Sequence, residues 1–204
     1  MNKLRNYQQF ALEWTVDRML KDYSPVRGAG LLLKPGLGKT AVVLHTLGLM
    51  KRLGLMKRAL VIAPLMPCQT AWMRERSDEN WPFGHITGIF AGGSGARRRE
   101  AALEANADVT AINPANVAWL AAYLKDKRDL RRYDIVVVDE VTDFKNHDTI
   151  RTKRLHRLLK HIPKRISLTG TATPTATTDL YGQTKVLDSG AALGAKVGSF
   201  RDEY

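Results

Sequence analysis

A glycine-rich segment that could hold phosphate groups lies near the start of the chain, in KPGLGKT at residues 34–40. It follows an apolar run typical of a buried strand and leads directly into a helical pattern. Gly36 and Gly38 allow a tight turn in which backbone N–H groups face phosphate oxygens, and the helix N-terminus that follows favours the same negative charge. In such a loop, Lys39 would bridge the β and γ phosphates of ATP, and Thr40 would place its hydroxyl on Mg²⁺. The alternative is a glycine turn with an exposed lysine.

Two adjacent carboxylates end the apolar run DIVVVDE at residues 134–140. One carboxylate can hold Mg²⁺ through water while its neighbour orients an attacking water, as phosphoryl transfer requires. We assign Asp139 to the metal and Glu140 to the base, with Lys39 as their catalytic partner. Acids also begin ordinary turns and cap helices. The pair follows Lys39 by about a hundred residues, and this spacing favours the catalytic assignment.

Small hydroxyl side chains follow a further apolar run, RISLT at residues 165–169, in the segment GTATP at residues 170–174. Thr169 and Thr171 could sense the γ-phosphate region and pass its state to a bound nucleic acid. We therefore expect these two threonines to couple the binding of ATP to the binding of nucleic acid.

Short runs rich in Val, Ile and Leu alternate with longer helical patterns, which predicts an α/β fold with a mostly parallel sheet and helices on both faces. In such a sheet the functional loops lie at the carboxyl ends of the strands, where the three segments above fall. The expected strands span residues 30–34, 58–63, 85–90, 108–112, 134–138 and 165–169. The expected helices span residues 5–22, 39–53, 67–79, 95–105, 115–126, 149–161 and 177–188.

Length and composition fit one globular domain, because 204 residues with 44% hydrophobic and 25% charged residues can form a core. The formal net charge of +12 favours a polyanionic partner, with nucleic acid first; a generic basic surface is the alternative. The single cysteine, Cys68, rules out an internal disulfide and is expected to be a small buried residue. There is no apolar signal core and no membrane-spanning run, so we expect a cytoplasmic protein without membrane contact.

The segments GLGKT, DEVT and SLTGTATP resemble, in order and spacing, motifs I, II and III of superfamily 2 helicases and translocases. Leu33 stands where the strict phosphate-loop pattern has a glycine. That departure is common in superfamily 2 and disfavours a small GTPase or kinase. The segment LRNYQQFALEW resembles the Swi/Snf-type branch in particular. There, Gln8 would match the glutamine that reads adenine.

Further segments extend this resemblance over nearly the whole chain. Residues 61–75 (VIAPLMPCQTAWMRE) are similar to motif Ia, and Asn113 lies where motif Ib is expected. The segment DEVTDFKN is similar to DEAHxxKN, with Val141 and Thr142 in place of the commoner Ala and His. The closing stretch is similar to phage and bacterial members, so the expected cytoplasm would be that of the host if the protein is phage-encoded. The resemblance implies that Pro64, Asn113 and Lys145 contact the DNA backbone without reading sequence.

The resemblance implies that residues 1–204 form the N-terminal RecA-like, ATP-binding domain of a DNA-dependent ATPase, either a helicase or a duplex translocase. A second RecA-like domain, with motifs IV to VI and an arginine finger, is absent from these residues. It would come from the full protein or in trans, and the isolated domain would be nearly inactive. The alternative is a nucleotide-gated or plain DNA-binding module without hydrolytic activity.

Two other patterns bear on the DNA interface. Basic residues cluster at residues 97–99, 125–132 and 151–165, and the last of these windows contains no acid. A solvated helix face is the alternative meaning of such a run. Four tryptophans are expected to pack in the core or between domains rather than to stack on bases, namely Trp14, Trp72, Trp81 and Trp119.

Overall fold

The computed structural model describes residues 3–21, 27–75, 85–93, 95–171, 177–194 and 196–203. Their centre is a six-stranded sheet in which every neighbouring pair of strands is parallel. The α/β fold expected from the alternating patterns is therefore confirmed. In sheet order the strands are β1 (Arg27–Leu32), β6 (Lys164–Thr169), β5 (Ile135–Asp139), β2 (Ala59–Ile62), β4 (Val109–Ile112) and β3 (Gly88–Phe90).

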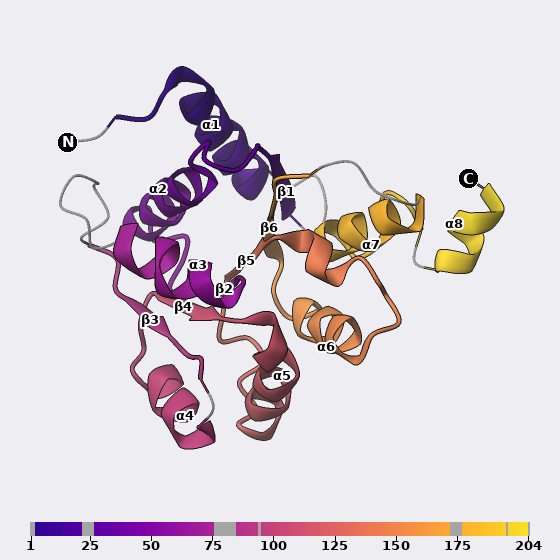
Figure 1. The fold of residues 1–204 in the computed structure, drawn as a ribbon. Coiled ribbons are helices and arrows are strands. Elements are labelled where there is room, and N and C mark those ends of the chain that lie inside the picture. Colours follow the sequence, from indigo (N-terminus) through magenta and orange to yellow (C-terminus); the bar gives the residue numbers. More distant parts are fainter. Residues whose placement is uncertain are drawn as a thin grey trace.

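Helices cover both faces of the sheet (Figure 1). One face carries α1 (Asn6–Leu20), α2 (Lys39–Arg52) and α3 (Leu65–Gln69), with a short π-helical turn, η1 (Ala71–Glu75). The other carries α4 (Ala96–Glu104), α5 (Val117–Asp126), α6 (Ile150–Leu159) and part of α7 (Thr177–Asp188). Two 3₁₀ turns, η2 (Pro114–Asn116) and η3 (Val141–Phe144), follow β4 and β5, and α8 (Val197–Glu203) packs on α7.

The central strands are apolar on both faces, because each face contributes to a separate core. Every residue of β2 and β4 is buried, as are the first four residues of β5. Successive residues along β5 point to opposite faces of the sheet: Ile135 belongs to the core on one face and Val136 to the core on the other. This two-sided burial explains why the strands are continuous apolar runs rather than alternating patterns.

Several expected boundaries were wrong in ways that have local causes. β1 spans Arg27–Leu32 rather than residues 30–34. The strand begins earlier because Arg27, Gly28 and Ala29 pair with the first residues of β6. The missing side chain at Gly28 lets α7 approach, since a Cβ there would come within 2.8 Å of the Leu187 carbonyl oxygen. The single helix expected over residues 67–79 is instead α3 followed by the π-helical turn, and residues 76–79 lie outside the described part.

The expectations for cysteine and tryptophan had mixed outcomes. Cys68 is fully buried, and burial raises the pKa of its thiol to about 12. Trp72 is also fully buried, and Trp119 is partly buried and stacks on Tyr123. Trp14 is 39% exposed and so is not a core residue, while Trp81 lies outside the described residues. In the part of the chain that is described, no helix is both long and apolar enough to cross a membrane.

Candidate active site

The candidate site lies along the carboxyl edge of the sheet. Leu32 pairs with Thr169 and Asp139 with Leu168, so β1, β6 and β5 end at nearly the same level. The glycine loop follows β1, the carboxylate pair ends β5, and the hydroxyl segment follows β6. The parallel register therefore brings together three segments that lie far apart in the sequence.

The glycine loop has the backbone that its residues predict. Gly36 and Gly38 have φ values of +81° and +74°, in the left-handed region that favours glycine. α2 begins at Lys39, so its free N–H groups point towards the loop. Lys39 Nζ donates to the Leu33 carbonyl oxygen at 2.7 Å, which fixes the side chain across the loop. Two of the three ammonium hydrogens remain for phosphate oxygens.

Gln8 is buried against the same loop. Its Nε2 donates to the Leu37 carbonyl oxygen at 3.1 Å, and its Oε1 accepts from the Arg5 backbone N–H at 2.8 Å. A Cβ on Gly38 would clash with Gln8 Nε2, so a side chain there would displace the glutamine. A carboxamide has two donors and two lone pairs. One of each remains, which is the combination that binds the N7 and N6 edge of adenine.

Asp139 is partly buried at the end of β5 and is held by an indole. Trp72 Nε1 donates to Asp139 Oδ2 at 2.9 Å, and Trp72 itself is fully buried. Burial raises the pKa of the Asp139 carboxyl, while the Trp72 hydrogen bond and the charge of Lys39 oppose this shift. A partly desolvated carboxylate suits a bound cation, because an added positive charge favours its ionised form.

Glu140 is fixed by two hydroxyl groups and an unusual backbone. Its Oε1 accepts from Thr142 Oγ1 at 2.6 Å and lies 3.0 Å from Thr169 Oγ1. Glu140 has φ +58°, a left-handed conformation that is rare for a non-glycine residue and costs about 1–3 kcal/mol. Its second carboxylate oxygen, Oε2, makes no hydrogen bond within the described residues. That oxygen is available to a ligand.

The hydroxyl segment packs on the glycine loop and on the carboxylate pair. Thr169 is buried, and its Oγ1 accepts from the Thr171 backbone N–H at 3.1 Å. A Cβ on Gly170 would lie 3.0 Å from Pro35 Cδ, which shows how closely this segment approaches the loop. Thr171 is exposed, and residues 172–176 lie outside the described part of the chain. The two threonines are thus adjacent, and Thr169 touches Glu140 directly.

The expected DNA contacts lie on the other half of the edge. Pro64 follows β2 and Asn113 follows β4, and these strands pair with Ile62 opposite Ile112. The structure therefore brings Pro64 and Asn113 together. Lys145 lies at the end of η3, where its Nζ is 3.2 Å from Asp179 Oδ2 on α7. Its charge is thus paired within the domain.

Three contacts at this site are not evident from the sequence motifs. Tyr7 Oη donates to the Leu37 carbonyl oxygen at 3.3 Å, Trp72 binds Asp139, and Thr142 binds Glu140. Thr142 stands where the resembling family commonly has His, and its hydroxyl provides a direct contact with the carboxylate. The sequence places Trp72 in the segment similar to motif Ia, but no pattern in it predicts that the indole binds Asp139.

The parallel sheet, the glycine loop at the start of α2 and the carboxylate pair at the end of β5 define a RecA-like P-loop domain. Comparisons with known proteins place it more narrowly. The SNF2-related domain family matches residues 7–195, so the chain belongs to that family. Protein p41 of Acyrthosiphon pisum secondary endosymbiont phage 1 is 30% identical over 178 residues, which is 83% of this chain and 37% of that protein.

Two solved structures share the fold. The Sulfolobus solfataricus SWI2/SNF2 ATPase core in complex with dsDNA has a TM-score of 0.80 at 24% identity, covering 100% of this chain and 39% of that one. The Sulfolobus solfataricus SWI2/SNF2 ATPase core domain has a TM-score of 0.70 at 23% identity, covering 100% and 38%. The chain therefore spans less than two fifths of the length of each of these relatives.

Proposed function

We propose that this chain is the ATP-binding and DNA-binding first motor domain of a DNA-dependent ATPase, acting as a helicase or a duplex translocase. Membership of the SNF2-related family supports ATP as the substrate. The observation that carries the proposal is the meeting of Lys39, Asp139 and Glu140 at one edge of the sheet, with Glu140 held in a strained backbone and one oxygen left for a ligand.

In the proposed mechanism, the backbone N–H groups of residues 36–40 and the Lys39 ammonium bind the β and γ phosphates. Thr40 and Asp139 would hold Mg²⁺, which when bound would neutralise phosphate charge. Glu140 orients the attacking water and accepts its proton at Oε2, because Oε1 already accepts a hydrogen bond from Thr142. Thr169 contacts Glu140 and could therefore report the state of the γ-phosphate to the DNA side, together with Thr171.

Lys39→Ala should weaken ATP binding by about 10-fold to 150-fold, because a hydrogen bond to a charged group contributes about 1.5–3 kcal/mol. Isothermal calorimetry with ATP and Mg²⁺ measures the change. Lys34→Ala is the matched control, since Lys34 is an exposed lysine of the same segment and should bind ATP as the parent does. Equal affinities for the parent and Lys39→Ala would overturn the phosphate-site assignment.

Duplex DNA should bind without sequence preference and with an affinity that falls steeply with salt. Each neutralised phosphate adds about −0.9 to the slope of log affinity against log salt, so four contacts would give about −3.6. Fluorescence anisotropy with one duplex and its scrambled sequence tests both points. A flat salt dependence, or a clear preference for one sequence, would contradict contacts to the backbone.

The second candidate function is a DNA-binding module without hydrolytic activity. The net charge of +12 is equally consistent with such a module, but the strained backbone of Glu140 would then have no functional explanation. ATP binding distinguishes the two functions. A chain that binds duplex DNA normally and shows no affinity for ATP would favour the binding module.

A further inference from the structure

Exposed cations cover the outer face of α6. Lys153, Arg154, Arg157 and Lys160 are all exposed, whereas the leucines of this helix are buried. Successive helical residues are about 100° apart, so these four lie within one strip about 120° wide. We call these four residues the α6 stripe.

Acidic partners are almost absent from the α6 stripe. Residues 149–165 contain no Asp or Glu. The Lys153 ammonium lies 3.3 Å from Asp148 Oδ1. The side chains of Arg154, Arg157 and Lys160 make no ion pair or hydrogen bond within the described residues. Like charges three or four positions apart destabilise a helix, and exposed faces that serve only solubility usually mix both signs. This arrangement therefore indicates an anionic partner.

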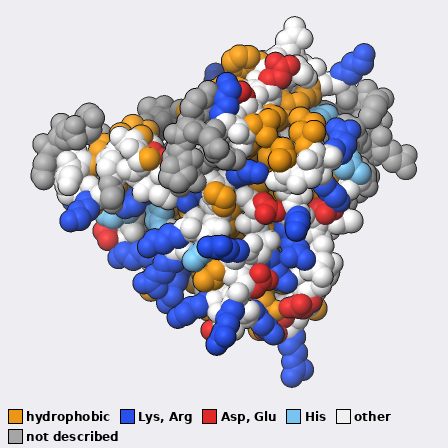
Figure 2. All heavy atoms as spheres, turned by 180° about the vertical axis from the view of Figure 1, so that it is seen from behind, with side chains coloured by type: hydrophobic (Ala, Val, Ile, Leu, Met, Phe, Trp, Pro, Cys, Tyr) orange, Lys and Arg blue, Asp and Glu red, His pale blue; other side chains and the backbone are white. Residues whose placement is uncertain are grey.

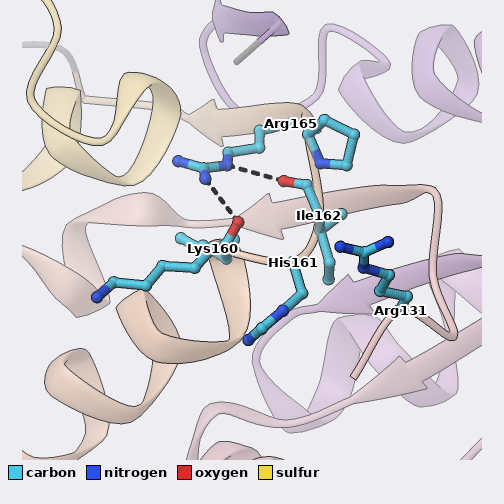
Figure 3. A pocket seen from close by; sticks show the side chains of 7 residues that line it. Arg131, Lys160, His161, Ile162 and Arg165 are labelled. Atoms are coloured by element: carbon cyan, nitrogen blue, oxygen red, sulfur yellow. Dashed lines mark hydrogen bonds between the residues drawn. The ribbon is translucent and has the colours of Figure 1, made fainter. Parts of the chain in front are cut away.

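The α6 stripe ends at a basic pocket. Arg165 is only 2% exposed and donates to the carbonyl oxygens of Leu159 at 2.6 Å and Ile162 at 3.2 Å, which offsets the negative end of the helix from inside. Figure 3 shows Arg165 turned towards these carbonyls, with Lys160 and Arg131 on opposite sides of the pocket. The cavity of about 420 Å³ has no acid in its lining of Arg131, Leu159, Lys160, His161, Ile162, Pro163 and Arg165.

The α6 stripe extends away from the carboxyl edge of the sheet, where Pro64 and Asn113 lie. α6 connects the carboxyl end of β5 to the amino end of β6, so the stripe leads from that edge to the opposite edge of the sheet. Figure 2 shows a dense group of Lys and Arg side chains on the side of the molecule where α6 lies. This surface is therefore distinct from the one formed by Pro64 and Asn113.

We propose that the α6 stripe and the pocket at its end form a second binding surface for the phosphate backbone of duplex DNA. The inference rests on the proposed function, because it deepens the partner assigned there. The stripe is about 10 Å long, and duplex DNA carries one negative charge per 1.7 Å of axis, so about six phosphates lie along that distance. Four cations can engage them without reading any base.

The triple variant Arg154→Ala/Arg157→Ala/Lys160→Ala tests this surface. Anisotropy with a labelled duplex should give a salt slope about 2.7 smaller in magnitude than that of the parent, since three contacts are lost, and an affinity at low salt at least about tenfold weaker. The charge-conserving control is Arg154→Lys/Arg157→Lys/Lys160→Arg, which should retain the slope and most of the affinity. ATP binding should be unchanged in both variants. The alanine variant should be at least as resistant to thermal unfolding as the parent, because like charges on one helix face are removed.

The outcomes separate this inference from the proposed function. If the parent binds duplex DNA and the alanine variant binds with the same slope and affinity, the α6 stripe is a solvated face and the inference is overturned. Equal loss in both triple variants would also overturn it, because charge would not be the cause. A parent that fails to bind duplex DNA at all would overturn the DNA role itself.

Discussion

We expect the 204-residue chain by itself to hydrolyse ATP near the uncatalysed rate and to respond little to added DNA. Phosphoryl transfer of this kind uses an arginine that stabilises charge in the transition state, worth about 10³–10⁵ in rate or roughly 4–7 kcal/mol. In the described part of the chain, no arginine hydrogen bonds to Lys39, Asp139 or Glu140. ATP binding and turnover should therefore separate.

Steady-state ATPase assays with and without duplex DNA measure this effect, on this chain and on the same chain joined to a second RecA-like domain. Joining should raise turnover by about 10³-fold or more. Glu140→Gln in the joined protein should remove most of that gain while leaving ATP binding intact, because the amide cannot accept a proton from water. Rapid, DNA-stimulated turnover by the single domain, lost in Glu140→Gln, would show that the arginine is supplied within this chain or by a second copy.

Acid should lower the free energy of unfolding of this domain through His156. An exposed histidine would have little such effect, because its pKa would be similar in the folded and unfolded chain. Burial, and then the charges of Lys185, Arg165 and His147, lower the pKa of His156 to about 4, and its Nε2 has no hydrogen-bond partner among the described residues. The unfolded chain binds this proton below about pH 6.5 and the folded chain only below about pH 4. The contribution of His156 to the free energy of unfolding is thus fully present above pH 6.5. It declines as the pH falls, and about 3 kcal/mol of it is lost at pH 4.

Urea unfolding at pH 7, 5 and 4 tests this dependence on the parent and on His156→Gln, which cannot take up the proton. The variant should lose less stability on acidification, by about 2 kcal/mol at pH 5. Lys185→Met removes the largest of the three charge effects on the pKa of His156, and it should therefore also reduce the loss of stability in acid. Identical pH profiles for the parent and His156→Gln would contradict a buried, neutral His156. The expected loss is large beside a typical unfolding free energy of about 5–15 kcal/mol.

The sequence by itself determined the features that depend on local chemistry. Glycines at positions 36 and 38 specify the left-handed turn of the glycine loop, because residues with a side chain rarely adopt that backbone conformation. The apolar runs specify strands buried on both faces, and a parallel sheet places their carboxyl ends on one edge. These rules were enough to predict the fold and the neighbourhood of Lys39, Asp139 and Glu140.

Only the tertiary structure decided which side chains meet across that edge. Trp72 and Asp139 are 67 residues apart, and Thr169 and Glu140 are 29 apart. Their contacts depend on strand register and on how the turn after α3 packs, which no local pattern encodes. The same holds for His156, whose low pKa comes from burial beside cations on α7 and β6. Side-chain partners distant in sequence are set by packing, whereas backbone turns and strand burial are set by the residues that form them.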